Sequence, residues 1–371
     1  MNPGLKELFF TFLKLGLLSF GGPVAHIALM DRELVDKKKW MTKDEYLNFI
    51  SMSNLIPGPN STEVALHIGY HKAGIQGMLA AGLGFISPAV ILVISLSFLL
   101  SSFASVNFIK EIINGIKPAL ILIILFAAIS FSKNVFKKYT HFFVGLIAIA
   151  MCFLGFNELI VLFSAGVFGI LIDKLINRDN QNKNDLKFFT LSPDLIFIFF
   201  SFLKIGALIY GSGYVLFAFY ESEFVSTGLL TKNNLMDAIL LGEITPGPLF
   251  SSSAYIGYLF NGLPGAVLAS IGIFLPALIF VYLINKIYKK ISGNKTFKIL
   301  LTYLNVSSVA LILFVCYNLS IETFTSNLND LWKLIIVAVI ILLIMLKFRN
   351  INSAIIILIS FVLSVGLYFI P

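Results

Sequence analysis

The sequence predicts an all-α protein that crosses a membrane several times, and three observations lead to this fold class. Hydrophobic residues make up 58% of the 371 residues, charged residues only 12%, and the mean hydropathy is +0.93. The apolar runs are continuous, whereas the strands of a membrane β-barrel would alternate polar and apolar residues. Many of these runs are long enough for helices that cross a bilayer. We therefore expect a polytopic helical membrane protein.

The first half of the chain recurs in the second half at a nearly constant distance along the sequence. The recurring segments are Phe12–Gly16 with Phe202–Gly206, Phe20–Ala25 with Tyr210–Val215, Pro57 with Pro246, and Gly77 with Gly265. Their spacing falls only from 190 to 188 residues over this stretch, which indicates a duplication. We expect an N-terminal repeat at 1–175, a linker at 176–190 and a C-terminal repeat at 191–371.

The charges orient the predicted helices. If each half has about five transmembrane helices and one re-entrant hairpin, most of the 27 lysines and arginines lie on one side of the membrane. Basic residues are concentrated on the cytoplasmic side, so we expect that side and the linker to be cytoplasmic and both termini to be outside. An odd number of spans in each half gives the two repeats inverted topologies. The cell membrane is the expected location.

A Pro-Gly-Pro sequence interrupts each half between two short apolar runs. Proline ends a helix because it lacks the N–H of a helix interior, yet it suits the first turn of the next helix. The arms beside the first break, residues 46–56 and 61–70, would cover only about half of a ~30 Å membrane core. Each segment therefore predicts a re-entrant helical hairpin whose broken tip faces protein or a watery cavity.

Inverted repeats would bring the two broken tips together near the midplane, where helix N-termini and hydroxyl groups can bind an anion. The predicted substrate-binding residues at the tips are Pro57, Gly58, Pro59, Asn60, Ser61 and Thr62 in one half and Pro246, Gly247, Pro248, Ser251 and Ser252 in the other. The alternative is that the polar side chains are ordinary N-caps that satisfy their own helices. Their presence in both halves favours the anion site.

The first apolar run of each half adds further candidates to this site. Lys14 and Lys204 occupy equivalent positions, and a cation in a membrane helix usually faces a cavity or a partner. The alternative is that each lysine reaches to the membrane surface. We expect breaks or close backbone approaches at small residues that follow these lysines. These residues are Gly21, Gly22, Gly211 and Ser212.

Three titratable side chains are candidates for carrying a proton that is coupled to transport. They are Glu63 just after the first Pro-Gly-Pro, Glu243 just before the second, and His26 in the first half. Either glutamate could instead pair with Lys14 or Lys204. Glu63 also suits a first helical turn, and a lone histidine is more often a packing residue, so structural roles are further alternatives. The histidines lack acidic or cysteine partners at metal-ligand spacing, and we expect no metal site and no cofactor.

The combination of motifs resembles the chromate ion transporter family. The residues that carry the resemblance are Phe12–Gly16, Ser19–Ile27, Trp40–Thr42 and Ile56–Pro59 in the first half, and Phe202–Gly206, Tyr210–Val215, Thr245–Leu249 and Gly272–Pro276 in the second. The chain is similar to a long, two-domain member over nearly its whole length. The departures are Tyr210, Ser212 and Asn60, which affect the expected substrate preference. The resemblance implies export of chromate, with isosteric sulfate as a relative or competitor.

The leading hypothesis is thus a secondary-active transporter that moves a tetrahedral oxyanion through a midplane site. A channel and a transporter for another anion, with chromate as a mimic, are the alternatives within the same class. An enzyme acting on a membrane lipid is the alternative from a different class, but no catalytic arrangement supports it and we expect no enzyme. The sequence has no ATPase signature, so primary active transport by this chain is not expected. The expected partners are the anion and the lipid bilayer, with no nucleic acid, and a homodimer is left open.

Overall fold

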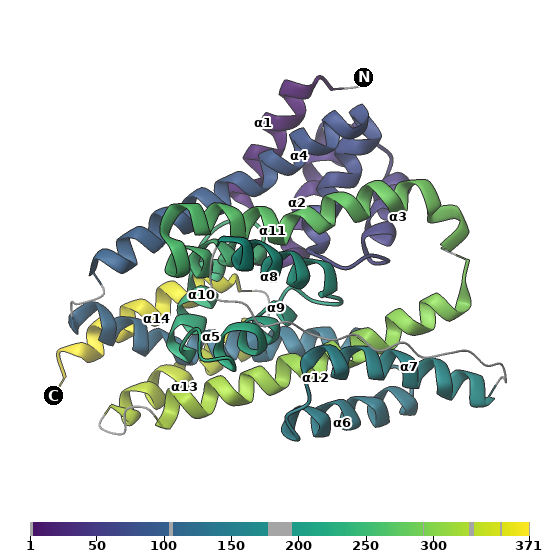
Figure 1. Ribbon diagram of the computed structural model, residues 1–371. Helices are drawn as coiled ribbons and strands as arrows, with labels where there is room; N and C mark the ends of the chain where they lie inside the picture. Colours follow the sequence, from purple (N-terminus) through teal and green to yellow (C-terminus); the bar gives the residue numbers. More distant parts are fainter. Residues whose placement is uncertain are drawn as a thin grey trace.

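The computed structural model describes residues 3–103, 107–176, 195–291, 293–325, 330–348 and 351–370, and this part of the chain is all-helical. The first half contains α1 (Leu5–Leu18), α2 (Gly22–Met30), a π-helical turn η1 (Asp31–Lys37), α3 (Lys43–Ser53), α4 (Asn60–Phe103), α5 (Asn107–Val135), α6 (Tyr139–Phe153) and α7 (Glu158–Ile176). Figure 1 shows these helices in purple and blue shades. The linker predicted at 176–190 lies almost entirely outside the described residues.

The second half has the same order of elements. It contains α8 (Leu195–Leu208), α9 (Val215–Tyr220), a π-helical turn η2 (Glu221–Val225), α10 (Lys232–Ile244), a 3₁₀ turn η3 (Leu249–Ser252), α11 (Ser253–Ile291), α12 (Lys295–Thr325), α13 (Leu331–Lys347) and α14 (Ser353–Tyr368). The domain boundaries remain predictions.

Local sequence explains several of these boundaries. The side chain of Thr42 accepts a hydrogen bond from the backbone of Glu45, whose carboxylate accepts one in return, so a capping box begins α3. Thr231 and Asn234 form the corresponding box at the start of α10. Because these boxes satisfy orphan amides of the first turn, the helix that leads into each Pro-Gly-Pro segment begins at a defined residue.

Two long helices are sharply bent at corresponding places. In α4 the bend is at Ala73 and Gly74, and in α11 it is at Asn261 and Gly262, with glycine φ values of 60° and 52°. Beside the first bend, a methyl group at Gly69 would lie 2.3 Å from the carbonyl oxygen of Gly77. The same 2.3 Å approach joins the equivalent glycines, 257 and 265, of α11. Only glycine permits this backbone crossing, which turns each long helix into two packed segments.

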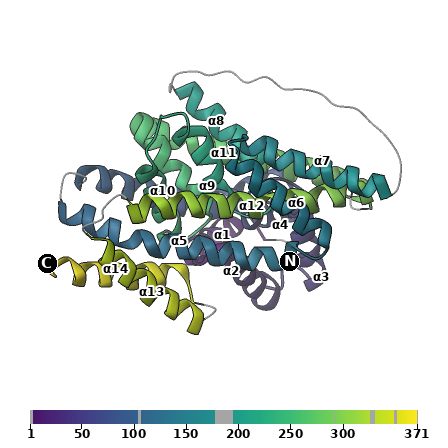
Figure 2. The ribbon, with the colours of Figure 1, turned by 90° about the horizontal axis from the view of Figure 1, so that it is seen from below.

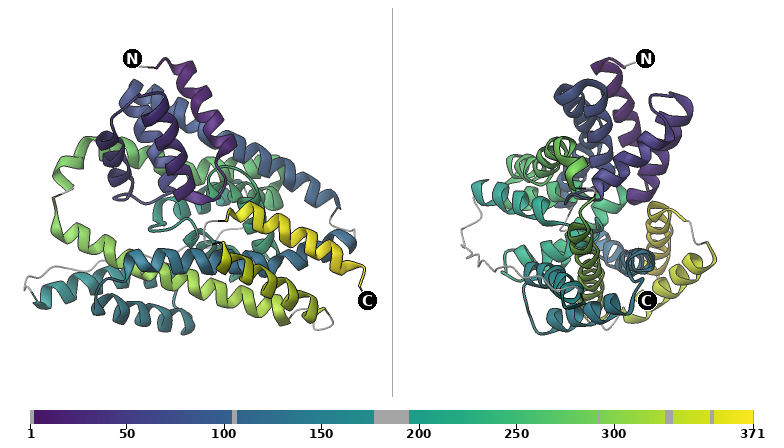
Figure 3. Two further views of the ribbon diagram at one scale, coloured as in Figure 1. Left: turned by 180° about the vertical axis from the view of Figure 1, so that it is seen from behind. Right: turned by 90° about the vertical axis from the view of Figure 1, so that its right-hand side faces the viewer.

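The helices pack in corresponding pairs around the molecule. The first helix of each half lies along the long bent helix of the same half, so α1 contacts α4 and α8 contacts α11. Helix α12 runs beside α5, as Figure 2 shows, and also packs on α6 and α7. Figure 3 shows the purple N-terminal helices gathered at one end of the molecule. Contacts between α4 and α11 join the two halves.

Four helical stretches of the described chain are long and apolar enough to cross a membrane. They are Asn60–Phe103, Phe108–Val135, Leu249–Tyr288 and Lys295–Thr325. Shorter apolar helices occur at Tyr139–Phe153, Glu158–Ile170, Leu195–Leu208 and Ser353–Tyr368. The protein is thus helical and of the multi-pass membrane type, as predicted. Five spans in each half and a re-entrant hairpin remain predictions. The first apolar run is divided into α1 and α2 at Ser19–Gly21.

Candidate functional site

The two Pro-Gly-Pro segments form the non-helical breaks after α3 and after α10. The glycines at their centres, Gly58 and Gly247, have φ values of 137° and 110°, which side-chain-bearing residues rarely adopt. The N–H of Gly58 donates to the carbonyl oxygen of Ile209 at 2.9 Å, and the N–H of Gly247 donates to that of Ser19 at 2.7 Å. Each tip is therefore bound to the end of the first helix of the other half.

Close packing fixes both tips further. A methyl group at Gly58 would lie 2.4 Å from Oε1 of Glu63 and 3.7 Å from the side chain of Ala277 in α11. A methyl group at Gly247 would lie 2.7 Å from the side chain of Ala89 in α4. Ala89 and Ala277 follow equivalent prolines, Pro88 and Pro276, so the reciprocal contact repeats on both sides. Each tip thus reaches across to the long helix of the opposite half.

A cavity of about 660 Å³ lies between these tips. It is bounded by the loop between α1 and α2, the loop between α8 and α9, the starts of α4 and η3, and the C-terminal end of α5. Among the described residues that line it there is no lysine, arginine, aspartate or glutamate. Its volume lies within the usual range of small-ligand sites and exceeds the size of one tetrahedral oxyanion, so an anion would keep water around it.

Neutral polar groups supply the hydrogen-bonding capacity of the cavity. Nδ2 of Asn60 donates to Oδ1 of Asn54 at 3.0 Å, and Nδ1 of His26 lies 3.1 Å from Oγ of Ser61. Asn305 reaches the same cavity from α12. The first amides of α4 have no partner in their own helix, and the helix dipole makes this end positive. The arrangement can bind a negatively charged group through neutral donors.

The predicted site residues fall into two groups by position. Those that line the cavity are Gly21, Gly22, His26, Pro59, Asn60, Ser61, Gly211, Ser212 and Pro248. Those that are buried at the tips without lining it are Pro57, Gly58, Thr62, Glu63, Glu243, Pro246, Gly247, Ser251 and Ser252. In the second half, Leu249 and Phe250 line the cavity in place of the serines. The predicted segments surround the cavity, but only some of the predicted side chains line it.

Lys14 and Lys204 do not line the cavity, because each is paired with a glutamate on a π-helical turn. Nζ of Lys14 is 3.3 Å from Oε1 of Glu33, and Lys204 forms an ion pair with Glu223. The two glutamates are 190 residues apart, as are the two lysines. Neither glutamate was among the predicted site residues, although the spacing that they share with the lysines was visible in the sequence. A hydrogen bond from Lys37, followed by one from Lys14, lowers the pKa of Glu33.

Glu63 and Glu243 are both buried, in different surroundings. Glu63 is 0% exposed, and neither carboxylate oxygen has a hydrogen-bond donor among the described residues. Tyr210, from the loop after α8, is close enough to interact with it electrostatically. Glu243 is 5% exposed and lies beside Tyr214 and Ser353. The two acids therefore belong to the tips and not to the wall of the cavity.

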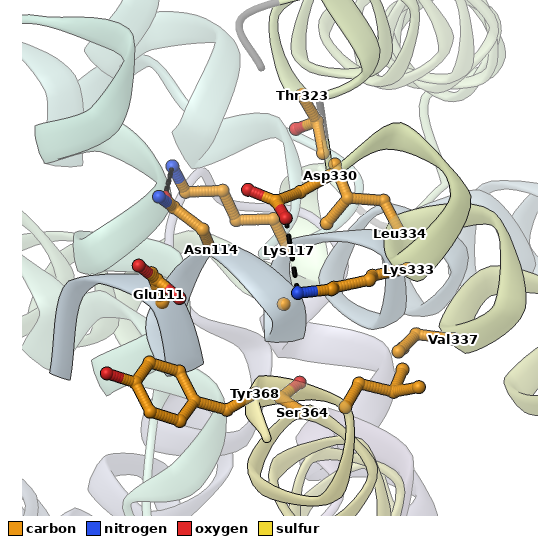
Figure 4. A pocket seen from close by; sticks show the side chains of 12 residues that line it. Glu111, Asn114, Lys117, Thr323, Asp330, Lys333, Leu334, Val337, Ser364 and Tyr368 are labelled. Atoms are coloured by element: carbon orange, nitrogen blue, oxygen red, sulfur yellow. Dashed lines mark hydrogen bonds and ion pairs between the residues drawn. The ribbon is translucent and has the colours of Figure 1, made fainter. Parts of the chain in front are cut away.

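A second, smaller pocket of about 60 Å³ lies between α5, α13 and α14, away from both tips (Figure 4). Nζ of Lys117 donates to the side-chain oxygens of Asn114 at 2.5 Å and Asn233 at 2.7 Å. Nζ of Lys333 lies 3.3 Å from Oδ1 of Asp330. Lys117 is only 7% exposed. Because its cations already have polar or acidic partners, this pocket is a weaker anion site than the central cavity.

The remaining predictions about cysteines and metals can be compared with the described residues. Cys152 and Cys316 are free thiols that are buried in the helical core. No group of three or more histidine, cysteine, aspartate or glutamate side chains within the described ranges could hold a metal ion.

Comparison with known proteins identifies the family. The model of the chromate transporter family matches residues 6–170 and again residues 196–365. The chain belongs to the chromate transporter family. This confirms the resemblance found in the motifs, including the long form with two family domains. Members are membrane transporters and not enzymes, in agreement with the expectation that the chain catalyses no reaction.

Individual relatives cover one or both halves of this transporter. An uncharacterised transporter of Methanocaldococcus jannaschii is 27% identical over 98% of this chain and 94% of its own length. A chromate transport protein of Cupriavidus metallidurans is 30% identical over 77% of this chain and 75% of its own length. An uncharacterised transporter of Bacillus subtilis, YwrB, is 25% identical over 49% of this chain but 96% of its own length. No solved structure matches this chain.

Proposed function

We propose that this protein is a secondary-active transporter that exports chromate, or a similar tetrahedral oxyanion, through the cavity between the two Pro-Gly-Pro tips. The observation that carries this proposal is the position of the cavity, which is bounded by equivalent loops of both halves. The substrate class is taken from relatives that are named chromate transport proteins. Sulfate has the same shape and charge and is the expected competitor.

The chemistry of the cavity suits an anion that must be released again. Backbone amides at the start of α4, the amide of Asn60 and the hydroxyl of Ser61 can donate hydrogen bonds to oxyanion oxygens. A fixed lysine or arginine would hold a dianion strongly, and conduction or transport needs binding weak enough for exit. Neutral donors around a hydrated cavity satisfy both requirements.

The proposed movement uses the reciprocal contacts between the halves. We propose that the halves are inverted repeats with about five spans and one re-entrant hairpin each, and that the cavity lies near the midplane of the cell membrane. The linker is then cytoplasmic and the termini are outside. In support, the bond from Gly58 to Ile209 has its counterpart in the bond from Gly247 to Ser19. Exchanging the conformations of the two halves would open the cavity to the other side.

Flux through the purified protein tests the function. In proteoliposomes we expect saturable chromate transport that sulfate inhibits and that a pH gradient drives against the chromate gradient. Flux that does not saturate and never exceeds equilibrium would indicate a channel. Saturable flux of another anion, with chromate and sulfate ineffective, would show that chromate is not the substrate.

A charge placed in the cavity tests the site. The substitution Asn60→Asp puts a carboxylate where the dianion would bind, and like charges at close range in poor solvent repel strongly. We expect loss of chromate binding by monodisperse purified protein. The matched control is Asn48→Asp, the same change at an exposed position of α3 away from the cavity, which should bind normally. Normal binding by Asn60→Asp would place the anion site elsewhere.

A further inference from the structure

Three titratable residues follow one face of the first segment of α4, from the Pro-Gly-Pro tip toward the surface. They are Glu63, His67 and His71, which are four residues apart in turn. Residues four apart on a helix are neighbours on the same face. The first two are 0% exposed, whereas the side chain of His71 is 47% exposed. The stripe therefore connects a buried carboxyl group with the aqueous surface.

The buried end of the stripe lies directly beneath the first tip. Oε1 of Glu63 is the atom that a methyl group at Gly58 would meet, at 2.4 Å. Tyr210 of the second half is close enough to interact electrostatically with Glu63, and α11 presents apolar Ala277 to the same tip. An ionised carboxylate is very costly to bury without a cation or donors, and neither is found around Glu63 in the described ranges. The carboxyl group therefore holds a proton in this conformation.

The ring N–H group of His67 has no hydrogen-bond acceptor among the described residues. Nδ2 of Asn285 donates to the carbonyl oxygen of Val281 at 2.7 Å, which identifies it as the amide nitrogen. It also lies 3.0 Å from Nδ1 of His67, so Nδ1 must be the acceptor and Nε2 must carry the ring proton. Nε2 has no acceptor among the described residues. An unpartnered donor thus lies one helical turn from the two unpartnered oxygens of Glu63.

The outer end of the stripe lies among charged groups. Nε2 of His71 is 4.0 Å from Oε1 of Glu45 on α3. The backbone N–H of Thr42 donates to Glu45 and lowers its pKa, so an ionised carboxylate lies beside His71 near neutrality. The ring of Phe49 stacks parallel to His67 at 6.2 Å and contacts His71 at 5.4 Å. One aromatic side chain thus packs on both imidazoles. The neighbouring Lys72 is turned away and donates to the carbonyl oxygen of Trp40.

We propose that His71 and His67 carry protons between the aqueous surface and Glu63, and that the protonation of Glu63 controls the first Pro-Gly-Pro tip. This inference rests on the proposed transport function. In the inward step, His71 takes a proton from water and passes it to Nδ1 of His67, which gives up the hydrogen bond from Asn285. The resulting imidazolium gives its Nε2 proton to the ionised Glu63 carboxylate. Only N–H and O–H bonds form and break, and the net change is one proton moved to Glu63. The reverse steps release it.

The second half does not repeat the stripe. The positions 188 residues after His67 and His71 are Tyr255 and Leu259, and the residue corresponding to Glu63 is a serine. The hydroxyl of Tyr255 donates to Oδ2 of Asp237 at 3.2 Å. A proton path of imidazoles is therefore confined to the first half, and it opens beside the basic segment that we propose to be cytoplasmic.

Two transport modes in the same proteoliposomes test the proposal. Exchange of labelled chromate for internal chromate needs no net proton movement, whereas uphill chromate accumulation driven by a pH gradient does. For His67→Gln we expect uphill accumulation, and the chromate-dependent proton flux seen with an internal pH dye, to fall roughly a hundredfold, a typical loss for a positioned acid–base group. Exchange should remain near the wild-type rate. His141→Gln, at a buried histidine bound to the carbonyl oxygen of Val135, is the control and should behave as wild type in both modes.

The outcomes separate this inference from the proposed function. Normal proton flux and uphill accumulation in His67→Gln would overturn the proton path. Absence of both transport modes in the wild type would overturn the transport function itself. If His67→Gln is not monodisperse after purification, His71→Gln decides, because its exposed side chain can be replaced without disturbing the core. It should slow the proton flux severalfold while exchange is kept, and an unchanged proton flux would again overturn the proposal.

Discussion

The two Pro-Gly-Pro tips have the same backbone conformation but different side chains. At the first tip, Asn60 and Ser61 face the cavity, and Glu63 lies beneath the break. At the second tip, Leu249 and Phe250 face the cavity, and the carboxyl group of Glu243 lies before the break. The reciprocal hydrogen bonds and glycine conformations remain the same at both. The difference shows that the backbone of the tip is a scaffold and that its side chains have specialised.

The helices that follow the two breaks also differ in geometry. Helix α4 begins as an α-helix at Asn60, whereas the second half starts with the 3₁₀ turn η3. The second half has one residue fewer between its Pro-Gly-Pro and the glycine at 257 than the first half has before Gly69. A 3₁₀ turn rises about 2.0 Å per residue against 1.5 Å in an α-helix, so it covers the same length with fewer residues. Counted from the last proline of each break, Leu249 and Phe250 stand where the first half has Asn60 and Ser61, so the same two positions line the cavity in both halves.

The largest expected effect comes from the tip glycines. Alanine at Gly58 or Gly247 would have to adopt a positive φ, at a cost of about 1–3 kcal/mol each. The new methyl group at Gly247 meets the helix-borne methyl of Ala89, whereas at Gly58 it meets the movable end of Glu63. We therefore expect both variants to melt at lower temperature, and Gly247→Ala to lose more. Gly366→Ala, where no atom lies within 4 Å, is the control. Equal melting temperatures for all three would refute the shared strained scaffold.

A smaller effect should distinguish the hydroxyl groups of the two tips. Ser61 lines the cavity beside His26, whereas Oγ of Ser252 donates to the carbonyl oxygen of Leu249 at 2.7 Å, away from it. Ser61→Ala should weaken chromate binding by about 1 kcal/mol, or roughly fivefold, the value of one hydrogen bond. Ser252→Ala should leave the dissociation constant unchanged. Titration calorimetry measures both, and an equal loss in the two variants would mean that both tips bind the anion.

The smallest expected effect is at the paired lysines. Lys14 is 60% exposed beside Glu33, and exposed ion pairs contribute only about 0–1 kcal/mol. Lys204 is 31% exposed beside Glu223, so its replacement should cost more stability. We expect Lys14→Ala and Lys204→Ala to bind chromate with nearly wild-type affinity, because neither side chain lines the cavity. A tenfold loss of affinity in either, restored by arginine, would return the lysines to the anion site.

The positions of helices and breaks could be predicted because local chemistry determines them. Hydropathy located the long helices, and the Pro-Gly-Pro segments marked their interruptions. The partners of Gly58 and Gly247 could not be predicted, because Ile209 and Ser19 are distant in sequence and contribute only carbonyl oxygens. Which residues after each break line the cavity could not be predicted either, because the lining is set by tertiary packing of both halves around it. The pairing of Lys14 with Glu33 follows from the π-helical turn, although the common spacing of both residues in the two halves was visible.

The neutral lining of the central cavity has an electrical consequence. With no lysine or arginine among its described lining residues, the charge of a bound anion is not cancelled by the wall that moves with it. A dianion carried across the membrane would therefore move its full charge through the transmembrane voltage. At about 2.3 kcal/mol per charge for each 100 mV, an interior-negative potential of that size would contribute about 4.6 kcal/mol toward moving it outward. The membrane potential would then favour export and oppose uptake, in addition to the effect of the coupled proton movement.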